Sequence, residues 1–289
     1  MDWTPGGLSD DVEDRRGSSG GGGFGGGGLG IVGLLFLVII SLVTGRNYIG
    51  SYLSGGGRVQ TQAARGPVAA SPQEERSAQL VSFVLDDVQH TWTAMLPEQT
   101  GRNYRHAKLV LFRDYTHSGC GVARSQTGPF YCPADEKVYI DLGFWDELRR
   151  IGGSTADFAQ AYVIAHELGH HVQNILGIER KVRGLSGNDP SQKNHLSVDM
   201  ELQADCLAGV WAHSTARRKI IDEADVEEGL KAAAAVGDDH IQKMERGAVS
   251  PESFTHGTSA QRTGWFKRGL QQGTVAACNT FSAGAGSSF

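Results

Sequence analysis

The sequence predicts an α+β fold that is mostly helical, with a small sheet, preceded by one transmembrane helix. Helices are indicated by apolar residues that recur at helical spacing, most clearly in Ala156–Leu176. Two short runs rich in apolar and β-branched residues, Lys108–Phe112 and Lys137–Leu142, predict strands. The membrane helix is predicted by the uncharged apolar run Leu29–Thr44. The chain has 289 residues, so enough sequence remains beyond this run for one domain with a substantial core.

Ahead of the predicted domain, which covers residues 71–289, the chain divides into three segments. Residues 1–28 combine charged residues with a tract that is all glycine except for one phenylalanine. Such a composition buries too little surface to fold, so we expect a disordered tail. Residues 29–45 form the predicted transmembrane anchor. Residues 46–70, which include three consecutive glycines, form a flexible linker.

The apolar run has two alternative interpretations. A cleaved signal peptide is disfavoured because the leader is long, acidic and glycine-rich, and because no small-residue cleavage site follows the run directly. A buried core helix is disfavoured by the flanking segments, which lack a core-forming pattern. Two arginines precede the run and two follow it closely, so positive charge does not decide its orientation.

The four cysteines predict the compartment. They show no Cys-x-x-Cys spacing, which argues against a zinc ribbon and fits two structural disulfides in an oxidising compartment. Of the three possible connectivities we favour Cys120–Cys132 and Cys206–Cys278. The alternative is four reduced, buried thiols in a cytosolic domain. We therefore expect a single-pass protein of the cell membrane, with its tail in the cytoplasm and its domain outside.

The predicted domain opens with a helix from Ser71 to Met95. Ser71 is a capping residue, a proline follows at the first helical position, and Glu74 completes a capping box. Further helices are predicted at Phe144–Ile151, Ala156–Leu176, Ser197–Ala216, Val226–Val236 and Ser259–Leu270.

The most informative motif is the run His166-Glu167-Leu168-Gly169-His170. Two imidazoles four residues apart lie on one face of a helix and can bind a single metal ion. His171 points ~120° away from that face, so we do not expect it to bind the same ion. The opposite side of the helix should face the core through Ala161, Ile164, Leu168, Val172 and Ile175.

A catalytic zinc site needs a third protein ligand and an open position for water. Glu201 and Asp205 share one face of the predicted helix Ser197–Ala216. Glu201 is the candidate third ligand, and Asp205 the candidate acceptor for the second ring N–H of a zinc-bound histidine. The alternative, a solvated acidic face, is the usual interpretation of an isolated pair of this kind. Beside the histidine motif, the solvated acidic face is less favoured than the two ligand roles.

Four segments together resemble the bacterial neutral zinc metallopeptidase family: HELGHH, ELQADCLAG, VYIDLGFWDEL and THGTSAQRTGWFKRG. The resemblance covers most of the chain beyond residue 70. It implies a zincin-like metallopeptidase domain, an N-terminal membrane anchor, Zn²⁺ as the cofactor, and a peptide or protein substrate. The candidate ligands His166, His170 and Glu201 resemble the gluzincin arrangement, in which the motif glutamate, here Glu167, acts as the base.

The resemblance to gluzincins also implies a donor for the transition state. His256 is the candidate, with Arg262 positioning it. In zinc peptidases of similar layout an edge strand beside the motif helix holds the extended substrate. Lys137–Leu142 is the candidate by position, and the alternative is an ordinary core strand. The expected activity is that of a zinc metalloendopeptidase, with zinc-activated water as the nucleophile and Glu167 as general base.

A second function from a different class remains open. The chain would then be a catalytically silent, zinc-stabilised binding or chaperone-like module tethered to the membrane. Nucleic acid is excluded as a partner because the net charge is −5 and no basic patch with interleaved aromatic residues occurs. An intramembrane protease is excluded because the motif lies far from the apolar run. The sequence makes no prediction of oligomeric state.

Overall fold

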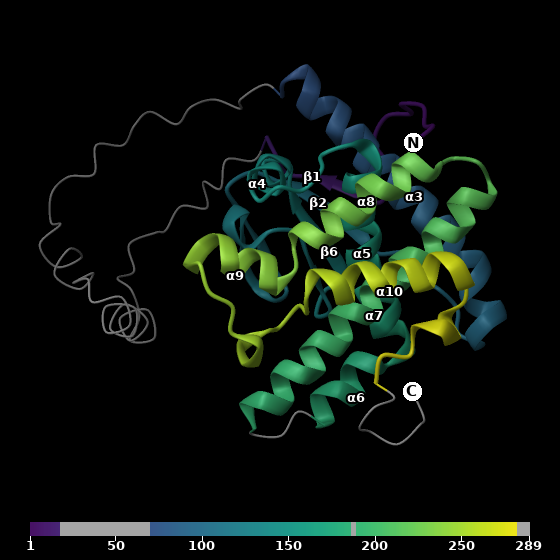
Figure 1. Cartoon of the computed structure of the whole chain (residues 1–289). Helices are drawn as coiled ribbons and strands as arrows, with labels where there is room; N and C mark the ends of the chain where they lie inside the picture. Colours follow the sequence, from purple (N-terminus) through teal and green to yellow (C-terminus); the bar gives the residue numbers. More distant parts are fainter. Residues whose placement is uncertain (18–69, 186–188, 282–289) are drawn as a thin grey trace, which may run out of the picture. The chain divides into compact units, whose positions relative to one another are not determined.

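The structure is a computed structural model that describes residues 1–17, 70–185 and 189–281. The described residues of Met1–Arg16 and Ala70–Phe289 form one compact unit. The unit is mostly helical with small sheets, as predicted. Helix α5 (Asp157–Leu176) is central, because helices α3, α7 and α8 and strand β5 all contact it (Figure 1).

Helix α3 (Pro72–Thr100) begins as the sequence predicts. The Ser71 side chain accepts a hydrogen bond from the backbone N–H of Glu74, and Pro72 occupies the first helical position. The helix continues beyond the predicted end at Met95. It ends at Gly101, whose left-handed conformation (φ 70°) suits glycine.

Helix α5 presents the predicted core face. Four of the five apolar residues proposed for this face are fully buried, and Ile175 is partly buried against the same core. The histidine motif therefore lies on a helix that is fixed by packing along its opposite side.

The main sheet has four strands in the order β1-β2-β6-β5. Strands β1, β2 and β6 are parallel, and β5 runs antiparallel to β6. A separate hairpin pairs β3 with β4. The bounds are β1 Val12–Asp14, β2 Lys108–Phe112, β3 Tyr115–Ser118, β4 Gly121–Arg124, β5 Phe130–Cys132 and β6 Lys137–Asp141.

The two central strands are buried on both faces, which explains their nearly continuous apolar sequences. Leu109 and Leu111 of β2 belong to the large helical core, whereas Val110 and Phe112 belong to a second cluster on the other face. Strand β6 is one of the two interior strands of the sheet, so the expectation that Lys137–Leu142 is an edge strand is wrong. The edge beside β6 is β5.

The expectation of a disordered tail is wrong for the first residues of the predicted 1–28 segment. Val12–Asp14 form β1 and pair with β2, with Val12 opposite Leu109. Arg16 forms an ion pair with Asp14 at 2.6 Å and another with Glu75 at 3.2 Å. Composition measures only what a segment can bury by itself. Here β1 gains its backbone partners from a strand about a hundred residues away, which composition does not report.

Both predicted disulfides, Cys120–Cys132 and Cys206–Cys278, are present. Within the described residues, no helix is long and apolar enough to cross a membrane. The predicted anchor, residues 29–45, and all but the last residue of the predicted linker lie outside the described residues.

The other predicted helices are present, and α7 begins earlier than expected because Asp189 caps it and Pro190 follows. Among the α-helices of the described residues, α6 and α9 were not predicted. The bounds are α4 Phe144–Arg150, α6 Ile178–Leu185, α7 Pro190–Arg217, α8 Glu223–Ala235, α9 Asp238–Arg246 and α10 Ser259–Gln272, with short 3₁₀ helices at Ser125–Thr127, Pro251–Ser253 and Val275–Cys278.

Glycines set the spacing of the helices that carry the site. A Cβ atom on Gly169 of α5 would lie 3.0 Å from the carbonyl oxygen of Ala204 in α7. A Cβ atom on Gly269 of α10 would lie 1.9 Å from the carbonyl oxygen of Cys206 in α7. The backbones of α5 and α10 therefore approach α7 more closely than any larger residue would allow.

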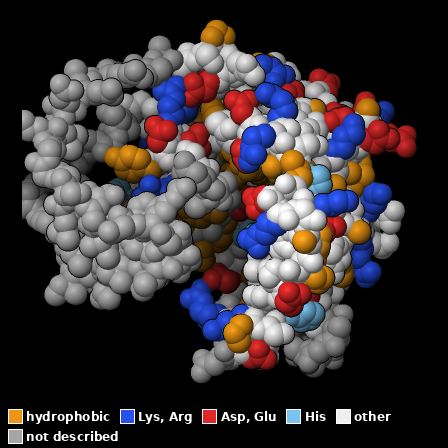
Figure 2. Space-filling model, turned by 60° about the vertical axis from the view of Figure 1, so that its left-hand side comes forward, with side chains coloured by type: hydrophobic (Ala, Val, Ile, Leu, Met, Phe, Trp, Pro, Cys, Tyr) orange, Lys and Arg blue, Asp and Glu red, His pale blue; other side chains and the backbone are white. Residues whose placement is uncertain are grey.

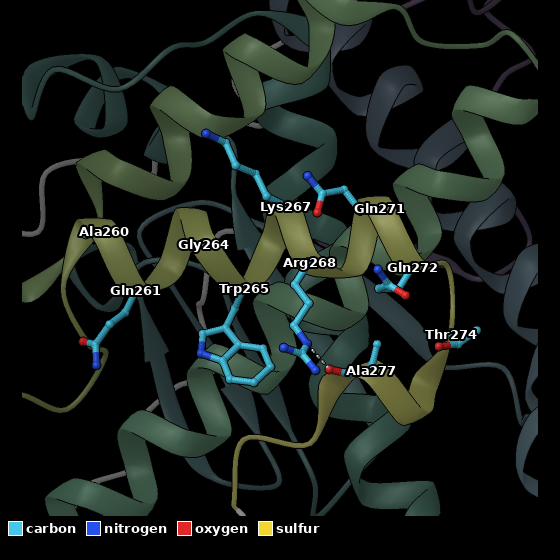
Figure 3. A pocket seen from close by; sticks show the side chains of 10 residues that line it. All are labelled: Ala260, Gln261, Gly264, Trp265, Lys267, Arg268, Gln271, Gln272, Thr274 and Ala277. Carbon is cyan, nitrogen blue, oxygen red and sulfur yellow. Dashed lines mark hydrogen bonds between the residues drawn. The ribbon is translucent and has the colours of Figure 1, made fainter.

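The outer side of α10 borders an open cavity of about 780 Å³ that shares no residue with the metal cleft described below. Figure 3 shows Trp265 and Arg268 side by side on this helix, with the guanidinium 5.2 Å from the indole ring. Arg268 also donates to the carbonyl of Ala277 at 2.7 Å. Its Nε–H is thus engaged within the fold.

Gly269→Ala should destabilise the protein by ~2 kcal/mol or more, because the added methyl group collides with the backbone of α7. Gly264→Ala on the same helix is the matched control. No atom lies within 4 Å of its added Cβ, so better helix propensity should stabilise by up to ~1 kcal/mol. Thermal or denaturant unfolding measures both. Equal stability of the two variants would contradict the close contact between α7 and α10.

Candidate metal centre

The structure brings His166, His170 and Glu201 together. The Nε2 atom of His166 lies 3.1 Å from Glu201 Oε2, and the Nε2 atom of His170 lies 3.4 Å from Glu201 Oε1. One nitrogen or oxygen atom from each side chain falls within 4.8 Å of the others, which is close enough to bind one ion. Helix α5 supplies the imidazoles and α7 the carboxylate, as the helical spacings predict.

The other ring nitrogen of each histidine has its own partner. His166 Nδ1 donates to Asp205 Oδ1 at 2.9 Å, and His170 Nδ1 donates to Gln173 Oε1 at 2.8 Å. These bonds place the ring protons on Nδ1 and leave both Nε2 atoms to face Glu201. The orientation is typical of zinc-bound histidines, whose second nitrogen contacts a carboxylate or amide oxygen.

Asp205 is fully buried, and its carboxylate has three hydrogen-bond partners, of which His166 is one. Arg262 donates to it twice, at 2.8 and 3.0 Å, and the hydroxyl of Tyr162 also donates to it. Arg262 therefore binds Asp205 rather than His256, the residue that it was expected to position. The pair of opposite charges compensates for the burial of both groups.

The pKa shifts of the three candidate ligands show that the site favours positive charge between them. Burial opposes a charge on His166, but the carboxylates of Asp205 and Glu201 raise its pKa to about 10. Burial likewise acts against protonation of His170, and Glu201 outweighs it and raises the pKa. For Glu201, burial is outweighed by the two histidines, and the pKa falls well below its ordinary value. The same carboxylates that favour a positive charge on the imidazoles would favour a divalent cation between them.

Glu167 follows the first histidine and lies on the cavity side of α5. Its side chain is largely buried, with 7% exposure, and lines the same cleft as His166 and His170. Within the described part of the chain, no hydrogen bond engages its carboxylate. This position suits a group that exchanges protons with a ligand in the cleft.

His256 lines the cleft from the loop before α10, and Asp238 holds it there. One oxygen of Asp238 accepts hydrogen bonds from the backbone N–H groups of Thr255, His256 and Gly257 at 2.6–2.9 Å. Its other oxygen lies 3.1 Å from His256 Nδ1. This hydrogen bond raises the pKa of His256, so the ring is a good donor through Nε2.

His171 ties α5 to the edge strand instead of joining the candidate ligands, as expected. Its Nε2 donates to the carbonyl of Arg105 at 2.7 Å, so its Nδ1 accepts from the hydroxyl of Tyr131 at 2.9 Å. Asn174 donates to the same hydroxyl at 3.0 Å. These bonds hold β5 beside the histidine motif.

The resulting cleft has a volume of about 560 Å³. The face that carries α4 and α9 is turned forward in Figure 2, which shows a hollow with hydrophobic side chains inside and charged side chains around it. The cleft combines the polar residues above with an apolar wall formed by Pro129, Phe130, Phe144, Val163, Val236 and Ile241.

Three functional residues were missed by sequence reasoning. Gln173 lies one helical turn beyond His170, so its i, i+3 spacing was a usable signal. Asp238 and Tyr131 gave no local signal, because their partners come from other elements of the fold.

The model of a family described as "Putative neutral zinc metallopeptidase" matches residues 1–281. The chain belongs to this family. The uncharacterized protein YpfJ of Escherichia coli (strain K12) is 49% identical over 288 residues, which cover 97% of this chain and 99% of that protein. An uncharacterized protein of Mycobacterium tuberculosis (strain ATCC 25618 / H37Rv) is 42% identical over 210 residues, 68% of each chain. No solved structure was found to match.

Substituting Glu201, His166 or His170 by alanine should abolish zinc binding, which metal analysis of purified protein measures. Asp205→Asn should weaken zinc affinity by roughly tenfold or more, because His166 loses its charged acceptor. His195→Ala, an exposed histidine of α7, is the control and should bind zinc normally. Full zinc occupancy in Glu201→Ala would exclude this residue as the third ligand.

Zinc binding should release protons at pH 7. The pKa of His166 is raised to about 10 in the metal-free protein, so this ring is protonated at pH 7 and zinc must displace its proton. The pKa of His170 is raised as well, which adds to the effect. Apparent affinity should therefore rise with pH, by up to ~10-fold per unit for each proton released. Titration calorimetry in buffers of different ionisation enthalpy counts the protons. A count of zero would show that the rings are neutral before zinc binds.

Proposed function

We propose that the protein is a zinc metalloendopeptidase that hydrolyses peptide bonds with Glu167 as general base. The observation that carries this proposal is the convergence of His166, His170 and Glu201 at one cleft, with the Glu167 carboxylate in the same cleft. Two imidazoles and one carboxylate are a ligand set of catalytic zinc sites, which keep a further position for water. Membership of a zinc metallopeptidase family supports the same activity.

Glu167 and His256 have separate roles in this reaction. A zinc ion, when bound, supplies a Lewis acid that acidifies water and polarises the substrate carbonyl. Glu167 takes the proton of the attacking water and delivers it to the nitrogen of the leaving amine. His256 is held by Asp238, which raises its pKa and so favours the protonated ring, and it donates a hydrogen bond to the oxygen that gains negative charge.

Strand β5 supports an extended peptide as the substrate. It is the last strand of the sheet within the described residues, so one edge of its backbone is not paired with another strand. Its residues Phe130 and Tyr131 line the cleft. A peptide that adds to this edge as a further strand would pass the candidate metal ligands with its backbone fixed.

Attachment to a membrane through residues 29–45 is part of the proposal. It is supported by the uncharged apolar composition of the run Leu29–Thr44. An extracytoplasmic catalytic domain is supported by the two disulfides, which persist in oxidising compartments. The pairing of β1 with β2 is incompatible with a single crossing by this run, so the attachment that we propose keeps β1 and the catalytic domain on one side of the membrane.

Glu167→Gln should retain zinc and fold normally while peptide hydrolysis falls by at least ~10²-fold, because the amide keeps the size of the carboxylate but cannot accept the proton. The assay uses the full chain, since β1 belongs to the domain, with zinc added and a mixed peptide library. Product analysis by mass spectrometry detects cleavage.

Glu223→Gln, an exposed substitution at the start of α8, is the matched control and should cleave like the unchanged protein. Equal hydrolysis by Glu167→Gln and the unchanged protein would refute the role of Glu167. Zinc binding with no hydrolysis by either protein would favour the zinc-stabilised binding module instead.

A further inference from the structure

A second cavity adjoins the metal cleft. Its volume is about 1110 Å³, and it lies among the start of α3, the end of β6, α4 and α9. The metal cleft and the second cavity share the lining residues Thr127, Gly128, Phe144, Val236 and Ile241, so they are continuous.

The junction lies at the beginning of the edge strand. Gly128 comes two residues before β5, and a Cβ atom placed on it would lie 3.5 Å from the ring of Phe144. The left-handed conformation of Gly128 (φ 71°) favours glycine at this point. A peptide that lies along β5 in the metal cleft therefore passes Gly128 and enters the second cavity.

The second cavity has an excess of negative charge. Six carboxylates and three guanidinium groups line it, and each of the three arginines is paired with a carboxylate of the same cavity: Arg113 with Glu74, Arg149 with Asp146, and Arg150 with Glu147. Asp114, Asp141 and Glu245 remain, and none of them forms an ion pair with another described residue. Their field favours a cationic ligand.

Two buried polar atoms in the wall of this cavity also point to a ligand. The indole nitrogen of Trp145 and the side-chain oxygen of Gln160 are buried, and both residues are only 6% exposed. Neither atom has a hydrogen-bond partner in the described part of the chain. An unpaired donor and an unpaired acceptor among the lining residues match the carbonyl and N–H groups of a polypeptide backbone.

We propose that the second cavity binds the substrate polypeptide on one side of the scissile bond and selects chains that carry lysine or arginine there. The inference rests on the proposed peptidase function, which it extends from a reaction to a substrate class. Peptides too short to reach the second cavity should be poor substrates, and acidic extensions should be worse than basic ones.

The test uses the full chain with zinc and three quenched fluorescent peptides that share one cleavable core. The first is the core alone, and the others carry either lysines or glutamates at the same positions of an extension, placed on each end in turn. We expect kcat/KM for the lysine peptide to exceed that for the glutamate peptide by about tenfold or more at low salt, with the extension on one end only. The ratio should fall as salt is added.

The double variant Asp114→Asn, Glu245→Gln should reduce the lysine-to-glutamate ratio at least threefold. Asn suits position 114 because Asp114 adopts a left-handed conformation (φ 62°), which asparagine tolerates. Glu227→Gln, an exposed residue of α8 that lines neither cavity, is the control and should leave the ratio unchanged. Because a ratio is measured, a general loss of activity in a variant does not mimic the expected result.

A binding measurement distinguishes failure of this inference from failure of the proposed function. Fluorescence anisotropy with labelled peptides on zinc-free Glu167→Gln should show tighter binding of the lysine peptide than of the glutamate peptide. Such binding without hydrolysis by the unchanged protein would overturn the proposed peptidase activity and retain the subsite for cationic peptides. Hydrolysis that depends on neither length nor charge, with equal binding of both peptides, would overturn the subsite and retain the peptidase.

Discussion

The buried carboxylate of Asp205 is the interaction on which the rest of the site depends. It joins three helices, because it accepts hydrogen bonds from His166 and Tyr162 of α5 and from Arg262 of α10, while it belongs to α7. Removing one partner of a buried ion pair typically costs ~3–5 kcal/mol, since the other charge is left without compensation. The orientation of the first candidate zinc ligand and the packing of three helices therefore share one group.

The glycine contacts explain how these groups reach one another. Gly169 lies inside the histidine motif and allows the backbone of α7 to approach, which brings Glu201 and Asp205 within reach of the imidazoles. Gly269 does the same between α7 and α10, and so Arg262 reaches Asp205. Small residues at helix crossings thus set the geometry of a polar centre, in addition to its hydrophobic packing.

Sequence reasoning succeeded where the signal is local. His166 and His170 were found because they lie one helical turn apart. Glu201 was found because it shares a helix face with Asp205, on the predicted helix that follows the histidine motif. It failed where partners come from other elements, as with Asp238 and its loop. Strand β5 was missed because it has three residues with a proline on each side, which does not resemble a strand pattern. Its position beside the cleft arises from pairing with β6 and from the bonds of Tyr131 to α5.

The pairing of β1 with β2 constrains how the protein meets a bilayer. The two strands are parallel neighbours in one sheet, yet the apolar run Leu29–Thr44 lies between them in the chain. A chain that crossed the bilayer once between them would place the strands in different compartments, where they could not share hydrogen bonds. The paired sheet and a single crossing therefore exclude each other. In the folded protein, Arg16 and Ala70 therefore lie on the same side of any membrane. The place of β1 in the sheet thus limits the membrane topologies that are open to the chain.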